Sequence, residues 1–168
     1  MASSEAALSD VLPEELVDFV EGGVSIQVGT RDAALRPECL RAVGCIVSPD
    51  RRSLLLLMNA ATAARTVANL GAGSPIAMTF SRPVDHRTVQ VKGTCLTVRP
   101  AAPHEQAAAE RYLALFTEGL YVVGMARAIV RRVRVTPALV AEVLVRELYH
   151  QTPGPGAGRR LEERDAPR

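Results

Sequence analysis

The chain of 168 residues is 48% hydrophobic and 23% charged, a length and balance typical of a single domain with a sizeable core. Its net charge of +2 is too small to argue for a nucleic-acid partner, and no run of eighteen apolar residues predicts a membrane span. The N-terminus has neither a basic start nor an apolar segment, so no signal peptide is expected.

The spacing of the cysteines and histidines indicates reduced thiols and no bound metal. Cys39, Cys45 and Cys95 form no C-x-x-C pair and lie in apolar, strand-like runs, where cysteine usually behaves as a small buried hydrophobe. The histidines, at positions 86, 104 and 150, have no ligand-like spacing. We therefore expect a cytoplasmic protein with buried cysteines and no metal site.

The N-terminal part is predicted to hold one short helix and three strands. The helix runs from Ser9 to Phe19, and apolar residues then alternate with polar ones from Val24 to Val28, as in a half-buried strand. One continuous strand is expected over residues 38–47, with Arg41 as the polar exception on its apolar face. After a turn, Ser53 to Met58 pairs back as a hairpin.

The stretch from Asn59 to Phe80 is predicted to contain a short helix followed by a strand. Thr62 can act as the N-cap, and the helix ends at Gly71. Arg65 is unusual because a cation in the first turn opposes the helix dipole. An anion such as a phosphate at the helix start would remove that cost. A solvated surface arginine is the other interpretation, and the pattern leaves both open.

The C-terminal half is predicted to hold two further strands, over residues 88–98 and 140–149, separated by helices over residues 104–117 and 120–132. The apolar phase of the first strand slips after Gly93, which predicts a β-bulge there. The whole pattern indicates a mainly β fold with α-helices: a six-stranded antiparallel barrel with peripheral helices. We expect one domain over residues 1–151, with a helical insertion at 103–132, and a Pro/Gly-rich, charged tail at 152–168.

Over residues 24–99 this order of elements resembles the split-barrel flavin-binding superfamily of pyridoxamine 5'-phosphate oxidase. The resemblance rests on the strand opening at Arg36-Pro37, the helix with Arg65, and the run from Arg87 to Gly93. It implies a split barrel that binds FMN between the subunits of a homodimer. The cofactor-binding residues that it implies are Arg41, Met58, Asn59, Thr62, Arg65, Thr66, Ser81, Arg87, Thr88 and Gln90.

Two functions remain open. The resemblance implies an FMN-dependent oxidoreductase that acts on an unidentified small molecule. The alternative is a non-catalytic carrier or sensor that binds flavin, deazaflavin or haem. The sequence contains no catalytic triad or carboxylate pair, so no catalytic residue is assigned. Hydride chemistry that belongs to a bound cofactor needs none.

Overall fold

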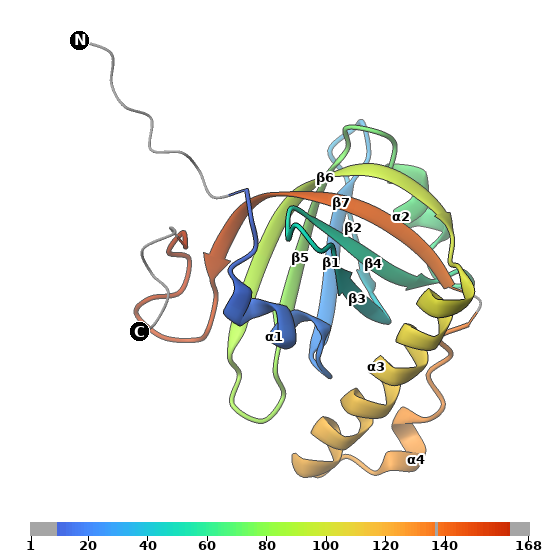
Figure 1. Cartoon of the computed structure of the whole chain (residues 1–168), viewed down its shortest axis with the longest axis vertical. Helices are drawn as coiled ribbons and strands as arrows, with labels where there is room; N and C mark the ends of the chain where they lie inside the picture. Colours follow the sequence, from blue (N-terminus) through green and yellow to red (C-terminus); the bar gives the residue numbers. More distant parts are fainter. Residues whose placement is uncertain (1–9, 137, 162–168) are drawn as a thin grey trace.

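The computed structural model describes residues 10–136 and 138–161. In this part of the chain, seven strands form one antiparallel sheet in the order β2-β1-β5-β6-β7-β4-β3 (Figure 1). The strands are β1 (Ser25–Arg31), β2 (Pro37–Arg41), β3 (Gly44–Val47), β4 (Ser53–Asn59), β5 (Pro75–Ser81), β6 (Thr88–Pro100) and β7 (Ala138–His150). The helices are η1 (Glu14–Leu16), α1 (Val17–Glu21), α2 (Ala64–Asn69), α3 (Pro103–Val122) and α4 (Arg127–Val130).

The sheet is curled into a half-barrel because β2 and β3 follow each other in the chain but lie at opposite edges. The Ala42 amide donates to Ile26 O of β1 (3.0 Å), and the next amide, of Val43, donates to Leu57 O of β4 (2.8 Å). Gly44 then has φ +149°, a conformation that side-chain-bearing residues rarely adopt. The single strand predicted over residues 38–47 is therefore wrong, and the sheet has seven strands rather than six.

The same break changes which side chains of this segment are buried. Leu40 faces the core with 9% of its surface exposed, whereas Cys39 and Arg41 are exposed on the other face. The prediction of an apolar face carrying both residues is thus wrong, and so is the prediction that all three cysteines are buried. Arg41 needs no partner to offset burial, because water reaches its guanidinium.

The strands β6 and β7 carry the bends that curl the sheet. The register shifts between Lys92 and Gly93, which confirms an irregularity at Gly93, but the unpaired residue there is Arg146 on β7. A second shift leaves Leu96 unpaired on β6 and causes the change of apolar phase seen in the sequence. Gly93 is required by packing, since a Cβ at this position would lie 2.5 Å from Leu144 O.

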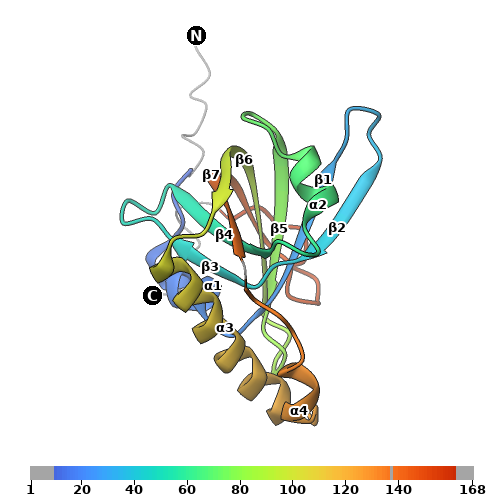
Figure 2. The ribbon, with the colours of Figure 1, turned by 90° about the vertical axis from the view of Figure 1, so that its right-hand side faces the viewer.

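The helical segment after β6 runs beneath one end of the sheet (Figures 1 and 2). α3 continues through Gly119 to Val122 and α4 is a single turn, so the predicted division into helices over residues 104–117 and 120–132 is wrong. The chain leaves α3 at Gly124, which has φ +94°. Tyr112 fastens α3 to the sheet by donating its buried hydroxyl to Val24 O (2.9 Å).

Residues 151–161 fold back along the end of β7. The Gly158 amide donates to His150 O, and the His150 amide donates to Arg159 O, both at 2.8 Å. Leu161 bonds to Leu148 O in the same way. Among the described residues no helix combines the length and apolar character needed to cross a membrane. Ser9, where the first helix is predicted to begin, lies outside the described residues, as do residues 162–168 of the predicted tail.

Candidate functional site

Five neighbouring strands place a row of polar side chains on the outer face of the sheet, away from the core. Cross-strand pairing aligns Arg41 with Gln27, Gln27 with Thr79, Thr79 with Gln90, and Gln90 with Tyr149. All five side chains are exposed or half-buried. Gln90 donates its amide to the Thr79 hydroxyl (3.3 Å), which fixes the middle of the row. We call this set of five residues the polar row.

A shorter row of hydroxyls lies beside it, formed by Ser25, Ser81 and Thr88. The Thr88 hydroxyl donates to His86 O (2.8 Å), so in its 2.8 Å contact with Ser81 it must accept. Ser81 is consequently the donor in that pair and presents only lone pairs to a ligand. Ser25 accepts from the Gln27 amide (3.5 Å) and keeps its own proton for donation.

On the other side of the polar row, the outer face has a shallow floor of small residues bordered by cations. Gly29 pairs with Ala77, and Ala77 pairs with Lys92. These residues line a hollow of about 450 Å³ together with Arg31 and Arg146. Lys92 lies 4.4 Å from the centre of the Tyr149 ring, and the hollow also includes Glu147, which accepts a hydrogen bond from Tyr149. Three cations against one carboxylate favour an anionic ligand.

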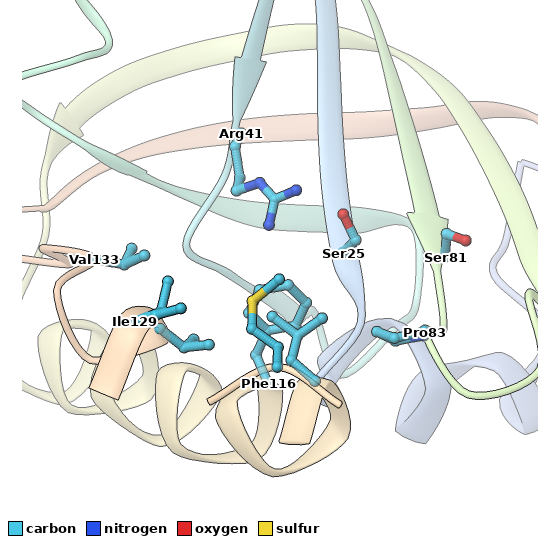
Figure 3. A pocket seen from close by; sticks show the side chains of 10 residues that line it. Ser25, Arg41, Ser81, Pro83, Phe116, Ile129 and Val133 are labelled. Carbon is cyan, nitrogen blue, oxygen red and sulfur yellow. The ribbon is translucent and has the colours of Figure 1, made fainter. Parts of the chain in front are cut away.

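A second cavity, of about 350 Å³, lies where β1, β2 and β5 meet the helical segment (Figure 3). Its polar lining comes from Arg41, Ser25 and Ser81. Its apolar lining comes from α3, α4 and the residues around them: Phe116, Leu120, Met125, Ile129, Val130 and Val133. In Figure 3, Arg41 points from the end of β2 toward Phe116, so its charge faces an apolar wall.

Arg41 lacks the carboxylate partner that several other arginines of the described chain have. Six such arginines form ion pairs with a carboxylate within 4.0 Å, at positions 36, 52, 65, 82, 99 and 127. Within residues 10–136 and 138–161, no side-chain hydrogen bond or ion pair holds the Arg41 guanidinium. Its guanidinium carbon instead lies over the Phe116 ring, 5.4 Å from the ring centre. An aromatic face stabilises a guanidinium but uses none of its N–H donors, so these are available to a ligand.

The candidate residues on and before α2 lie apart from the polar row. Thr62 does not cap the helix, since its hydroxyl donates to Asn59 O (3.3 Å) and the N-cap residue is Ala63. Arg65 is 82% exposed and lies 3.3 Å from the Glu38 carboxylate, which already compensates its charge. A phosphate here would compete with Glu38.

Three further candidates are engaged within the protein. The Thr66 hydroxyl is buried without a hydrogen-bond partner, so a surface ligand could reach it only if α2 moved. Asn59 is buried and donates its amide to Arg134 O (2.5 Å). Met58 is fully buried in the core. These three side chains present no surface to a ligand in this structure.

The outer face therefore gathers four of the ten predicted residues: Arg41, Ser81, Thr88 and Gln90. Arg87 lies near the end of this face and contacts the Phe19 ring, 4.7 Å from its centre. The ten predicted residues omitted Tyr149 of β7 and, on β1 and β5, Ser25, Gln27 and Thr79. The alternation of polar and apolar residues along β1 and β5 places these residues on the solvent side, and cross-strand register is what joins them to Arg41 and Gln90.

Several solved structures align with most of this chain. A putative pyridoxamine 5'-phosphate oxidase from Lactobacillus delbrueckii aligns over 84% of this chain and 95% of its own, at 18% identity and a TM-score of 0.53. The chain has the pyridoxamine 5'-phosphate oxidase-like fold. HupZ of Group A Streptococcus aligns over 88% and 100% of the two chains, at 17% identity and a TM-score of 0.54. An F420 reductase aligns over 82% and 98%, at 14% identity and a TM-score of 0.55.

The evidence for the pyridoxamine 5'-phosphate oxidase-like fold is structural. No protein-family model matches the sequence, and no curated protein matches it. The structure thus confirms the predicted resemblance at the level of fold and of a mainly β architecture with helices. At identities below 20%, this likeness does not transfer an activity.

Proposed function

We propose that this chain binds FMN on the outer face of the sheet, between the subunits of a homodimer, and reduces a small molecule with electrons from a nicotinamide donor. The observation that carries the proposal is the polar row, whose amides and hydroxyls lie in register across a sheet of this fold. The ring edges of a flavin alternate hydrogen-bond donors and acceptors, and amide and hydroxyl side chains pair with both. Structures described as a putative pyridoxamine 5'-phosphate oxidase and as an F420 reductase share the fold and support a redox function.

Different side chains would hold the ring and the phosphate of the cofactor. Gln90 and Thr79 would orient the ring, and the small floor at Gly29 and Ala77 allows a flat group to approach the backbone. The hollow with Lys92 supplies cations for the phosphate. Bound FMN would supply the hydride chemistry, and the protein's own residues would bind it, orient it and exclude water. Over the whole reaction, two electrons and a proton pass from the nicotinamide to the small molecule, and water supplies the second proton.

The homodimer is part of the same proposal. Apolar side chains remain exposed at the C-terminal end of α3, near the outer face; they include Tyr121, Val122 and Val123. A contiguous apolar surface of this kind is typical of an interface. A stable dimer should bury more than about 1,000 Å². Sedimentation velocity at micromolar concentration should therefore give the mass of a dimer, and a monomer would contradict a site shared between subunits.

The cofactor is tested by absorption and fluorescence titration of the purified protein with FMN. We expect flavin bands on the protein and a Kd about tenfold or more weaker in Lys92→Gln, because an ion pair to the phosphate is lost. Arg65→Gln tests the phosphate position predicted from the sequence, and Arg41→Gln tests the other arginine of the β2–α2 region that the resemblance implies for cofactor binding. Arg111→Gln, an exposed residue on α3, is the control and should leave the Kd unchanged.

The outcomes separate the functions. Bound FMN that NADPH bleaches without oxygen supports the oxidoreductase. Bound FMN that no nicotinamide reduces contradicts it and indicates a carrier or sensor. A deazaflavin bound in place of FMN, or a Soret band on adding haem, overturns FMN as the cofactor. If FMN, deazaflavin and haem all fail to bind, the cofactor site itself is overturned.

A further inference from the structure

The cavity between β2 and the helical segment combines one charged end with an apolar wall (Figure 3). On the wall, Met125, Ile129 and Val133 keep 41%, 57% and 39% of their surfaces exposed. Each square ångström of apolar surface that a ligand removes from water contributes about 25 cal/mol. The wall therefore favours a ligand with a hydrocarbon body, and its volume of about 350 Å³ lies within the range of small-molecule sites.

The charged end offers two hydrogen-bond donors. Arg41 has five N–H groups that its contact with Phe116 leaves free, and Ser25 keeps its hydroxyl proton while it accepts from Gln27. Ser81 presents only lone pairs, because its proton goes to Thr88. A planar carboxylate matches this end best, since a guanidinium can bind both of its oxygens.

We propose that this cavity binds a small monocarboxylate with an apolar body. One cation, Arg41, lines the cavity, so a single negative charge balances it, whereas a phosphate dianion would be left partly uncompensated. A neutral hydrocarbon would bury the guanidinium without a partner, which costs free energy. The chemistry of the lining thus selects both the charge and the body of the ligand.

The cavity adjoins the outer face of the sheet, where the cofactor is proposed to bind. Arg41 belongs to both the cavity and the polar row, and Ser81 belongs to both the cavity and the row of hydroxyls. A carboxylate held by Arg41 would lie beside a cofactor on the outer face. We therefore assign as the substrate class of the reduction monocarboxylates whose apolar body carries a reducible double bond. That bond takes up a hydride and a proton while the nicotinamide is oxidised, and the carboxylate at Arg41 stays unchanged. This assignment rests on the proposed function, whereas the binding itself does not.

The test is calorimetric titration of the full-length protein, without added flavin, with 2-naphthoate and with the neutral analogue 2-naphthalenemethanol. We expect saturable binding of 2-naphthoate and about tenfold or more weaker binding of the alcohol, because the alcohol cannot form the charge-assisted pair. Arg41→Gln should weaken 2-naphthoate binding to a similar degree and leave the alcohol nearly unaffected.

Two more variants complete the experiment. Ile129→Glu places a carboxylate on the exposed part of the wall and should abolish 2-naphthoate binding through repulsion. Arg36→Gln removes a cation that pairs with Asp32 outside the cavity, and should have no effect. Thermal melts check that each variant is folded. No binding of 2-naphthoate by the folded wild type, or binding that Arg41→Gln does not weaken, overturns the proposal. Because this titration contains no added flavin, a lack of 2-naphthoate binding does not affect the conclusion drawn from the FMN titration.

Discussion

A buried carboxylate, Glu105, helps to hold the start of α3 against the sheet, and the substitution Glu105→Gln tests its contribution. Glu105 is 1% exposed and accepts hydrogen bonds from both terminal nitrogens of Arg99, at 2.8 and 2.6 Å. It also accepts from the Ala102 amide at 2.7 Å. A glutamine keeps one acceptor oxygen and loses the charge, so at least one of these bonds is lost.

The expected magnitude follows from the pKa of this group. The Arg99 guanidinium, together with the Ala102 amide, lowers the pKa of Glu105 from 4.5 to about 2. At 1.36 kcal/mol for each tenfold change in proton affinity, this corresponds to about 3 kcal/mol. Arg99 is 42% exposed, so water screens the pair, and we expect Glu105→Gln to lower the free energy of unfolding by about 2 kcal/mol at pH 7.

The pH dependence gives a second check on the same residue. The pKa is lower in the folded state than in the unfolded state, so the stabilisation is present above pH 4.5 and is lost as the pH falls toward 2. The difference in unfolding free energy between wild type and Glu105→Gln should fall to about half at pH 3. A difference that stays constant from pH 7 to pH 3 would refute the electrostatic explanation.

Urea unfolding followed by circular dichroism measures these differences. Glu110→Gln is the matched control, because Glu110 lies on the same helix and is exposed. We expect it to change the unfolding free energy by less than about 0.5 kcal/mol. Equal effects of the two substitutions at pH 7 would show that the buried pair contributes nothing measurable. Contacts other than this ion pair would then hold α3, and with it the wall of the cavity, in place.

Two further predictions concern the sheet. Gly93→Ala should lower the free energy of unfolding by about 3 kcal/mol, because its Cβ would meet Leu144 O at 2.5 Å. Gly71→Ala, where a Cβ meets no atom closer than 3.8 Å, should change the free energy of unfolding by less than about 1 kcal/mol; urea unfolding measures both variants, and equal effects would argue against the steric explanation. In the folded protein a thiol reagent such as dithionitrobenzoate should titrate Cys39 alone, because burial raises the pKa of the other two thiols, and all three should react in guanidinium chloride. Rapid reaction of more than one thiol in the native state would contradict the burial pattern.

The phosphate of the proposed cofactor has more than one candidate location. The sequence drew attention to Arg65 because a cation in a first helical turn is unfavourable by itself. In the structure Glu38 supplies the missing negative charge, so this arginine no longer requires a ligand. The hollow with Arg31, Lys92 and Arg146 has more uncompensated positive charge, and no local sequence pattern joins these three residues. The three glutamine variants at positions 41, 65 and 92 decide between the locations.

Local sequence determined those features that depend on neighbouring residues. The alternation along β1 placed Ile26 and Val28 in the core and Gln27 on the solvent side, because strand side chains alternate between faces. The apolar phase slip in β6 predicted an irregular strand, and Gly93 marked a point where two backbones approach closely. The order of the elements was enough to indicate the fold.

Other features depended on contacts between residues distant in the chain. Residues 38–47 read as one strand because every position suits a strand; only the exchange of partner from Ile26 to Leu57 at the corner splits it. That exchange turned Arg41 outward, toward Phe116, about 75 positions further along the chain. The polar row and the cavity exist through cross-strand register and through the packing of α3. Tertiary structure alone could decide them, because side chains that share a site here are brought together by pairing and not by spacing in the sequence.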